Sequence, residues 1–450
     1  MRKQDLNNLL REYVKNNLSP TKEERELASS LYNAFKSALG QNCFLTGSYA
    51  RFTAIRPLHD LDIIFVAGKF DPNNLNPQAI LSDLQRTIQS SFKNPTTYKV
   101  KIALQTHSIT ISFIENGTEK IAVDIVPALI SGEKNEFGDD IYFVPEILHA
   151  GWHKRQTLYE DFAKTKKTEI DWWIKSDPKG YIKATSILDE KNNDFRKVAK
   201  FVKRWKHNCK EADDNFGLKS FHIEQVIFGT FRQNSAFDIT DAIFKFFCDL
   251  PQIISYPQIK DRADQKRFID DYLNNLTDLQ KENIIKARDS FLIKWEYLSE
   301  APRIADLLAA GFYQRSSNNN GICTEQYLFD FRIPTFIEKD VELRIRGRVF
   351  PISGGFRERI LNAIGLIERD RKIEFRVSGN APSVDIFKWK VKNDDKSIEP
   401  RGEITDHSTR NDPEYTKYRG AHYVECYAIK DGICIARARQ NVVLGSDGIT

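Results

Sequence analysis

Two aspartates separated by one residue are the most informative feature of the sequence. Asp60 and Asp62 flank Leu61 in a short apolar segment with the character of a β-strand. Successive side chains of a strand point to opposite faces, so both aspartates project from one face while Leu61 faces the core. Two carboxylates held so close repel each other unless a divalent cation lies between them. The pair therefore predicts a site for Mg²⁺, which takes one or two carboxylates together with substrate phosphates.

Two further features could complete such a site. Gly47-Ser48 precedes the pair, and a glycine lets the backbone approach a phosphate while neighbouring N–H and hydroxyl groups bind its oxygens. Asp124 is an isolated charge in the apolar segment Ile121–Val126, which is costly unless something pairs with it. Metal coordination beside the first two aspartates would supply that pairing. Two ions could then activate an attacking hydroxyl and stabilise a leaving pyrophosphate.

Each feature has a simpler explanation when it is taken alone. Most Asp-x-Asp pairs are solvated or cap helices, most buried aspartates pair with arginine or backbone N–H groups, and Gly-Ser is commonly a turn. The order of the features along the chain favours catalysis. We therefore expect Asp60, Asp62 and Asp124 to be catalytic and to bind the metal. Gly47 and Ser48 are expected to bind the nucleotide.

The set resembles the active-site signature of the polymerase-β-type nucleotidyltransferases. It is most similar to the branch that contains cyclic GMP-AMP synthase, oligoadenylate synthase and the bacterial cyclic-oligonucleotide synthases (CD-NTases) of anti-phage defence. The resemblance implies template-independent synthesis of a cyclic or short linear oligonucleotide second messenger, with two Mg²⁺ ions that Mn²⁺ can replace. One departure is His59, where many relatives carry a small polar residue, and its imidazole could alter the position of the acceptor.

Two later segments also resemble this branch. Phe195–Lys206 is similar to the helix that directs a lysine at the donor triphosphate, and Leu218–Glu224 is similar to the motif that follows it. The resemblance assigns Lys203 to the triphosphate, Ser220 to a phosphate and Phe221 to stacking on the base. From the residues alone, Lys203 would suit the solvated face of a basic helix and Phe221 would suit a core.

The elements that must position these residues follow from hydrophobic periodicity. The resulting fold class is α+β, with a polymerase-β-like palm that includes N-terminal helices (residues 1–150), a helical second lobe that completes the nucleotide cleft (151–320) and a β-rich domain (325–450). Strand patterns in the palm surround one helical pattern at Pro77–Phe92. Asn318–Gly321 is polar and turn-forming, which predicts a linker.

The β-rich segment resembles the adenylyl/guanylyl-and-SMODS C-terminal sensor domain, which is proposed to sense nucleotides or their derivatives. Asp431-Gly432 between two alternating segments predicts a hairpin. Aromatic and basic residues alternate nearby at Tyr415, Lys417, Tyr418, Arg419, His422, Tyr423, Arg437 and Arg439. Aromatics for bases and cations for phosphates would bind a nucleotide ligand. A β-sandwich with tyrosines at its rim and solvated cations explains the same pattern.

The composition of the chain limits the kinds of partner that it is expected to bind. The net charge is +5, with 67 Lys+Arg against 62 Asp+Glu, and this near balance argues against a large groove for a polymer. The six cysteines are scattered, and no apolar segment approaches the length of a membrane span. We therefore expect a cytoplasmic protein with no membrane association and no nucleic-acid template. Its expected partners are nucleoside triphosphate substrates and a separate effector protein that responds to the product.

Two other functions remain open from the sequence. The chain could be an RNA-tailing nucleotidyltransferase, although its charge balance argues against that function. It could also be a non-catalytic nucleotide-sensing protein, although a retired active site has no reason to keep three clustered carboxylates.

Overall fold

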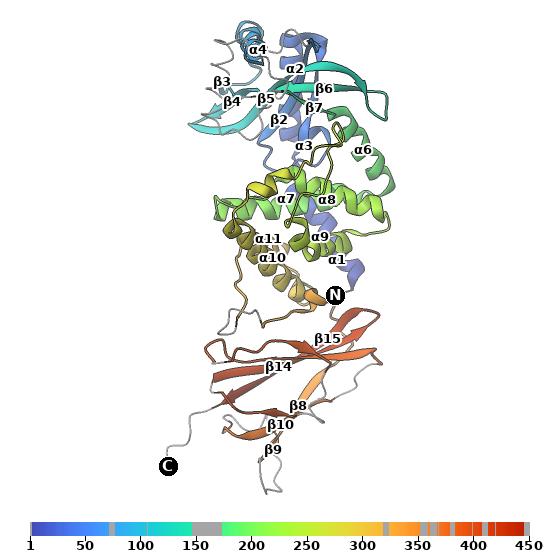
Figure 1. The fold of residues 1–450 in the computed structure, drawn as a ribbon, viewed down its shortest axis with the longest axis vertical. Coiled ribbons are helices and arrows are strands. Elements are labelled where there is room, and N and C mark those ends of the chain that lie inside the picture. Colours follow the sequence, from blue (N-terminus) through green and yellow to red (C-terminus); the bar gives the residue numbers. More distant parts are fainter. Residues whose placement is uncertain are drawn as a thin grey trace.

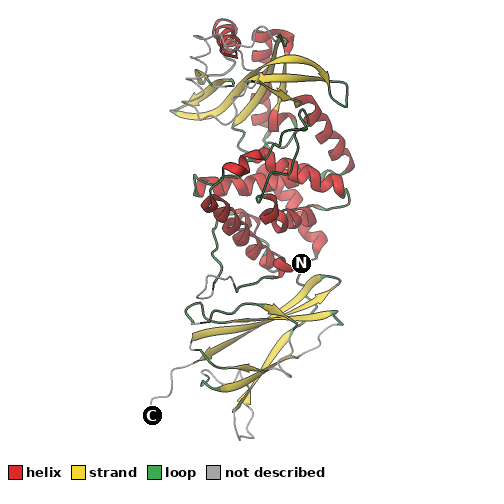
Figure 2. Cartoon of the chain, viewed as in Figure 1, coloured by secondary structure: helices red, strands yellow, loops and turns green. Residues whose placement is uncertain are grey.

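The chain folds into three regions arranged along one long axis (Figure 1). A sheet with helices lies at one end, a helical region lies in the middle, and a β-rich region lies at the other end (Figure 2). The architecture is α+β, as the sequence predicts. The computed structural model describes residues 2–71, 77–105, 107–145, 173–317, 324–351, 359–360, 367, 369–378, 383–397, 399–406, 413–418 and 420–444.

The first region is a mixed sheet with the strand order β1-β2-β5-β4-β3, extended from β5 by β6 and β7. Its strands are β1 (Cys43–Thr46), β2 (Asp60–Lys69), β3 (Lys99–Leu104), β4 (Ile109–Glu115), β5 (Thr118–Lys134), β6 (Asp140–Pro145) and β7 (Trp173–Ser176). β2 and β5 are parallel, and the other neighbours are antiparallel. The helices α2 (Lys22–Leu39) and α4 (Pro77–Ser91) pack on this sheet. The predicted helix at 77–92 is confirmed.

Local sequence explains two elements that support the aspartates. α2 begins with a capping box, in which Thr21 Oγ1 accepts from the Glu24 N–H at 3.2 Å and Glu24 Oε2 accepts from the Thr21 N–H at 2.6 Å. Such reciprocal bonds satisfy donors that the first helical turn leaves unpaired. In β2, Leu61 and Ile63 are fully buried, and this alternation turns the aspartates of the strand to the other face.

The middle region is an assembly of helices around an aromatic core. Its helices are α1 (Lys3–Tyr13), α6 (Pro178–Lys191), α7 (Asp194–Ala212), α8 (Ser220–Gln233), α9 (Ile239–Ile253), α10 (Asp278–Leu298) and α11 (Ile304–Leu308). Shorter helical segments elsewhere in the described chain include Val14–Leu18, Gly40–Asn42, Asp271–Asn275 and Leu328–Phe331. Phe247 stacks on Phe291 with ring centroids 3.7 Å apart, and Trp205 meets Phe247 edge-on at 4.8 Å. These rings join α7, α9 and α10 into one unit.

The first helix of the chain packs in this middle region. Leu6 and Leu10 of α1 are buried in the same cluster as Phe195 of α7. Arg11 also forms an ion pair with the carboxylate of Asp194 at 2.7 Å. α1 thus belongs structurally with the second lobe, whereas the sequence pattern grouped it with the palm. The expected boundary near residue 150 falls within residues 146–172, which lie outside the described residues.

The C-terminal region is a sandwich of two four-stranded sheets, in the orders β13-β10-β8-β9 and β12-β11-β14-β15. The strands are β8 (Arg344–Pro351), β9 (Arg359–Ile360), β10 (Arg371–Ser378), β11 (Ile386–Lys392), β12 (Ile404–Thr405), β13 (Glu414–Tyr415), β14 (Gly420–Lys430) and β15 (Ile433–Leu444). Ile373 and Phe375 of one sheet pack against Val424 and Cys426 of the other.

The predicted hairpin between β14 and β15 is confirmed. Lys430 pairs with Ile433, and the two residues between them have φ of 50° (Asp431) and 73° (Gly432). Positive φ at both central positions is the type I′ turn, whose twist matches that of the flanking strands.

The sandwich packs on the end of α10. The Arg437 guanidinium lies 3.6 Å from the ring centroid of Tyr297 and forms an ion pair with Glu300. Phe329 and Phe336 are buried in the core of the helical region, so that core uses residues beyond position 320. The expected linker Asn318–Gly321 lies outside the described residues.

Within the described ranges, no helix has the length and apolar character needed to cross a membrane. The cysteines in those ranges are buried free thiols at positions Cys43, Cys209, Cys248, Cys426 and Cys434.

Candidate active site

The register of the N-terminal sheet places the carboxylates of Asp62 and Asp124 on neighbouring strands, directly beside each other. Asp62 of β2 is the register partner of Thr46 in β1 and of Asp124 in β5. Asp124 in turn pairs with Thr110 of β4, whose hydroxyl donates a hydrogen bond to the Asp124 carboxylate. Neighbouring residues on a rung project from the same face of a sheet. Asp62 and Asp124 are thus adjacent although they are far apart in sequence, and Asp60 lies two residues before Asp62.

The Gly47-Ser48 turn lies directly against this rung. Gly47 has φ of 67°, and a Cβ atom there would lie 1.7 Å from Asp62 Oδ2. Only glycine allows both this conformation and this approach. Gly47 and Ser48 begin the short helix α3 (Gly47–Ala50), and the Ser48 carbonyl accepts from the Thr53 N–H at 2.9 Å. The turn predicted to bind phosphate is thereby held beside the carboxylates.

Burial and the closeness of the carboxylates raise the pKa of Asp60 and of Asp62. Desolvation, followed by the charge of Asp124, raises the pKa of Asp60. The same causes, together with the charge of Asp60, raise the pKa of Asp62 to about 6. Burial and like charge both disfavour an ionised carboxylate. The folded chain therefore holds these side chains in a place where an added positive charge would stabilise them.

These side chains line a cavity of about 420 Å³ between the sheet and the helical region. Every residue predicted for the nucleotide site lines it, namely Gly47, Ser48, Asp60, Asp62, Asp124, Lys203, Ser220 and Phe221. The cavity is also lined by Arg51, His59, Lys206, His207 and Glu224. The structure thus brings together residues from β2, β5, α3, α7 and α8.

Lys203 is buried at the centre of the interface between the two regions. Its side chain is 6% exposed, and Nζ donates to the Thr53 carbonyl at 2.9 Å and lies 3.8 Å from the Glu224 carboxylate. Desolvation lowers the pKa of Lys203 to about 8, partly offset by Glu224. Lys203 therefore does not lie on the solvated face of a basic helix, which was the alternative left open by the sequence.

Glu224 anchors the turn and the helices to each other. Its carboxylate accepts hydrogen bonds from Arg51 Nε and from Thr53 Oγ1, the latter at 2.6 Å. Burial acts to raise the pKa of Glu224, but the nearby charges of Arg51 and Lys203 outweigh it and keep this pKa below its usual value. A buried carboxylate with three such partners stabilises one arrangement of the two regions.

Sequence reasoning did not identify Glu224 or Arg51 as site residues. Glu224 is an isolated charge among the apolar residues Ile223 and Val226 of α8. That is the same signal that pointed to Asp124, and it could have been applied here. The partner, Arg51, could be found only from the tertiary structure.

The remaining wall of the cavity holds aromatic and basic groups. The Phe221 ring meets Tyr181 edge-on at 5.1 Å, and the Arg51 guanidinium lies 5.1 Å from its centroid. The rings of His59 and His207 lie 6.0 Å apart. His59 is therefore part of the cavity wall, beside the carboxylates, where its bulk would contact a second substrate.

The donor set has the chemistry of a magnesium site, since hard oxygen ligands on adjacent strands suit Mg²⁺. Among the described residues, however, no three His, Cys, Asp or Glu side chains form a cluster arranged to hold a metal ion. The three aspartates line one cavity without converging on a common point. The fit rests on the pairing of Asp62 with Asp124 in register, on the carboxylate of Asp60 two residues earlier in the same strand, and on the raised pKa of Asp62.

Comparison with known proteins shows two family matches. Residues 5–155 match the Second Messenger Oligonucleotide or Dinucleotide Synthetase (SMODS) domain. Residues 324–445 match the Adenylyl/Guanylyl and SMODS C-terminal sensor domain. The N-terminal part of the chain is thus similar to second-messenger oligonucleotide synthetase domains, and the C-terminal part is similar to the sensor domain that accompanies them.

One curated relative is the cyclic AMP-AMP-AMP synthase of Escherichia coli (strain MS 115-1). It is 29% identical over 211 residues, which cover 45% of this chain and 56% of the relative. The chain thus matches little more than half the length of that protein.

Two solved structures are also similar. E. coli MS115-1 CdnC with ATP is 20% identical, covers 67% of this chain and 94% of its own, and has a TM-score of 0.49. Elizabethkingia meningoseptica CdnE cyclic dinucleotide synthase with GTP and Apcpp is 16% identical, covers 56% of this chain and 85% of its own, and has a TM-score of 0.37.

Proposed function

We propose that the protein joins nucleoside triphosphates without a template into a cyclic or short linear oligonucleotide that acts as a second messenger in anti-phage defence. The observation that carries the proposal is the shared cavity, in which three aspartates of the sheet face Lys203 and Ser220 of the helical region. The SMODS match over residues 5–155 supports the same reaction class.

In the proposed reaction, an acceptor hydroxyl attacks the α-phosphorus of a donor triphosphate. A new P–O ester bond forms, the bond from the α-phosphorus to the pyrophosphate oxygen breaks, and the hydroxyl proton leaves toward Asp124 or solvent. Asp60, Asp62 and Asp124 would hold two Mg²⁺ ions, or Mn²⁺ in their place, which supply Lewis-acid activation of the hydroxyl and of the leaving group. Asp124 suits the role of proton acceptor because it is fixed by Thr110.

The donor triphosphate would lie between the Gly47-Ser48 turn and the helical region. The turn offers backbone N–H groups and a hydroxyl, and Ser220 offers a second hydroxyl at the start of α8, where the helix terminus favours anions. Lys203, with a pKa of about 8, is protonated at neutral pH and so provides a cation. Phe221 would stack on the donor base through the part of its ring that Arg51 leaves free.

The acceptor would occupy the side of the cavity beside His59 and His207. Lys206 lies on the same side of α7 as the cavity and contributes a further cation there. Because the cavity is about 420 Å³, two nucleotides would bring their reacting groups together inside it while their outer parts reach the solvent. The product would act on a separate effector protein in the cytoplasm.

Mass spectrometry of the reaction products tests this proposal. The purified chain is incubated with all four ribonucleoside triphosphates and Mg²⁺ or Mn²⁺, with and without an RNA oligonucleotide. We expect pyrophosphate release and a discrete small oligonucleotide in both samples. Extension of the RNA alone would instead indicate a tailing enzyme, and no product with either metal would indicate a nucleotide-sensing protein.

A further inference from the structure

The C-terminal sandwich contains a second cavity, of about 460 Å³. It draws its lining from both sheets. The floor is the apolar core, formed by Ile373, Phe375, Val424, Val442 and Leu444. Ligand sites are typically concave and mostly apolar with a few polar groups at fixed positions. This cavity is concave, combines an apolar floor with polar side chains around it, and shares no residue with the catalytic cavity.

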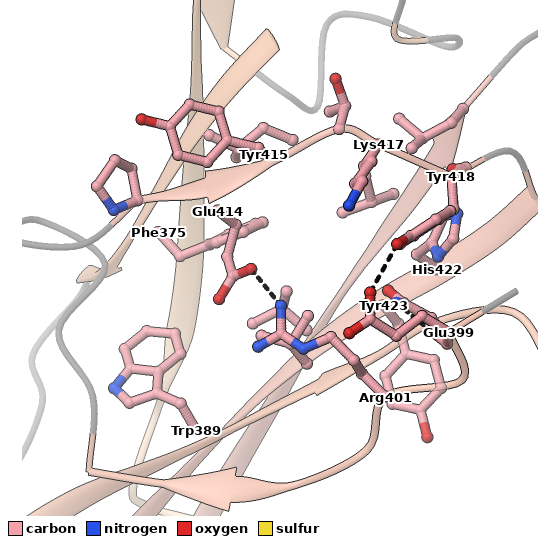
Figure 3. Close-up of a pocket in the computed structure, with 18 of the residues that line it drawn as sticks. Phe375, Trp389, Glu399, Arg401, Glu414, Tyr415, Lys417, Tyr418, His422 and Tyr423 are labelled. Atoms are coloured by element: carbon pink, nitrogen blue, oxygen red, sulfur yellow. Dashed lines mark hydrogen bonds and ion pairs between the residues drawn. The ribbon is translucent and has the colours of Figure 1, made fainter. Parts of the chain in front are cut away.

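Aromatic side chains form its walls. Trp389, Tyr415, Tyr418 and Tyr423 line the cavity above the apolar floor. Figure 3 shows the Trp389 indole and the Tyr415 ring on either side of an open space, with Glu414 between them. Tyr415 is 59% exposed, so it borders the entrance. Flat aromatic walls suit a flat aromatic ligand, which can stack on them.

A single ion pair supplies the polar group beside Trp389. Arg401 donates to Glu414 at 2.7 Å, and the pair projects into the space that Trp389 and Tyr415 border (Figure 3). Side by side, a guanidinium and a carboxylate offer a hydrogen-bond donor next to an acceptor. The edges of nucleobases carry this same combination of adjacent donors and acceptors.

The charges that the described residues place in this cavity do not favour phosphate. Arg401 lies within electrostatic reach of three carboxylates, those of Glu414, Glu403 and Glu399. Glu399 also accepts from the Tyr418 hydroxyl at 2.6 Å. Among the described lining residues, Arg401 and Lys417 are the only lysine or arginine cations, so carboxylates outnumber them. A polyphosphate placed inside would meet repulsion from the unbalanced carboxylate.

The other cations that the sequence pattern assigned to phosphate binding are used elsewhere. Arg437 contacts Tyr297 of α10 and Glu300, which follows the end of that helix. Arg439 lies 3.6 Å from the Tyr423 ring centroid and is absent from the cavity lining. His422 uses both ring nitrogens in backbone hydrogen bonds, at 3.2 Å from Asp394 N and 2.8 Å from the Tyr418 carbonyl.

Arg419, the remaining member of that set, lies outside the described residues. Of the described members of the set, Tyr415, Lys417, Tyr418, His422 and Tyr423 line this cavity, whereas Arg437 and Arg439 do not.

We propose that this cavity binds an uncharged nucleobase that enters ring first, stacks on Trp389 and pairs its edge with Arg401 and Glu414. Any ribose phosphates would then lie outside the cavity, in solvent. Nucleosides and nucleotides share this chemistry, and the number of phosphates should have little influence on affinity. The site is separate from the catalytic cavity, so it would report on bases without consuming them.

Isothermal titration of the full-length chain tests the proposal. Adenosine, cytidine and ATP are titrated in metal-free buffer, where the uncompensated aspartates of the catalytic cavity disfavour triphosphate. We expect adenosine and ATP to bind within about threefold of each other, because the phosphates contact nothing inside the cavity. Trp389→Leu should weaken both by roughly tenfold or more, since it removes the stacking surface.

A second variant guards against misfolding of Trp389→Leu. Tyr415→Ser changes an exposed ring at the entrance and should weaken adenosine binding severalfold. Its matched control is Tyr256→Ser, an equally exposed tyrosine of the helical region (56%) that should leave binding unchanged. The proposal is overturned if adenosine does not bind at millimolar concentration or if both cavity variants bind it as wild type does. It is equally overturned if ATP binds more than tenfold tighter than adenosine through Lys417.

Discussion

The two cavities of this protein are similar in size, at about 420 and about 460 Å³, but they balance charge differently. In the catalytic cavity, the carboxylates of three aspartates repel one another, and Lys203 contacts Thr53 and Glu224. In the sandwich cavity, Arg401 is already paired with Glu414.

The difference indicates what each cavity is suited to bind. The catalytic cavity holds mutually repelling carboxylates, so divalent cations would relieve the repulsion and would then attract phosphates. The sandwich cavity pairs Arg401 with Glu414 and has further carboxylates at Glu399 and Glu403, so a neutral ring costs little desolvation there while an anionic ligand is repelled.

The two cavities also differ in how they are built. The catalytic cavity lies between two regions of the chain and depends on their relative position, which Glu224 stabilises through Arg51 and Thr53. The sandwich cavity lies within one region, between sheets that share a core. Changes in the packing of the helical region should therefore affect catalysis more than base binding.

The largest effect should follow from removing the unbalanced charge. Asp60→Asn with Asp62→Asn should reduce product to background, because the amides cannot hold the metal ions. Thermal stability without metal should hold or rise, since the like charges that raise the pKa of Asp62 are gone. Mass spectrometry and differential scanning fluorimetry measure the two outcomes.

The control for that variant is Asp306→Asn, which changes an exposed aspartate of α11 whose side chain is 69% exposed. It should alter neither product nor stability. Full turnover by the double variant would show that Asp60 and Asp62 are not needed for the reaction.

A smaller effect is expected at Lys203. Lys203→Ala removes a charge-assisted contact to the triphosphate, which is worth about 1.5–3 kcal/mol or roughly 10- to 150-fold in kcat/KM. Glu224 keeps Arg51 and Thr53 as partners, so the fold should survive. Steady-state kinetics measured at varied nucleotide and at varied Mg²⁺ concentration separate the effect on nucleotide binding from the effect on metal binding.

The nucleotide dependence should change far more than the metal dependence. Lys197→Ala, at a more solvent-exposed position of the same helix, is the control. Wild-type kinetics for Lys203→Ala would assign the residue a purely structural role in the interface.

The smallest effect is a pH dependence of stability. Asp62 has a folded-state pKa raised to about 6 from an ordinary 3.8. Below about pH 4 the carboxyl is protonated in both the folded and the unfolded chain, and its stabilising contribution is complete. That contribution is lost as the pH rises through about 6, because the unfolded chain ionises first.

We therefore expect Asp62→Asn to become more stable than wild type as the pH increases from 4 to 6, with the difference constant at higher pH. Thermal unfolding of both proteins across this range, without divalent metal, measures the difference. The same difference at every pH would show that Asp62 is solvated like an ordinary carboxylate.

The sequence by itself determined much of the fold and indicated most of the residues that line the candidate active site. Alternating Leu61 and Ile63 predicted the strand that carries Asp60 and Asp62, and Asp431-Gly432 predicted the hairpin. These features depend on local periodicity and on backbone conformation, which neighbouring residues encode. The order of the aspartates and of Gly47 along the chain likewise indicated a shared site.

Only the tertiary structure decided which distant side chains meet. Nothing local indicates that Arg51 pairs with Glu224 or that Lys203 is buried against Thr53. The use of Arg437 at the interface with α10, where it contacts Tyr297, is equally invisible in the sequence. A basic residue has the same local pattern whether it is solvated, paired or aimed at a phosphate, because its role depends on charges and burial contributed by residues far away in the chain.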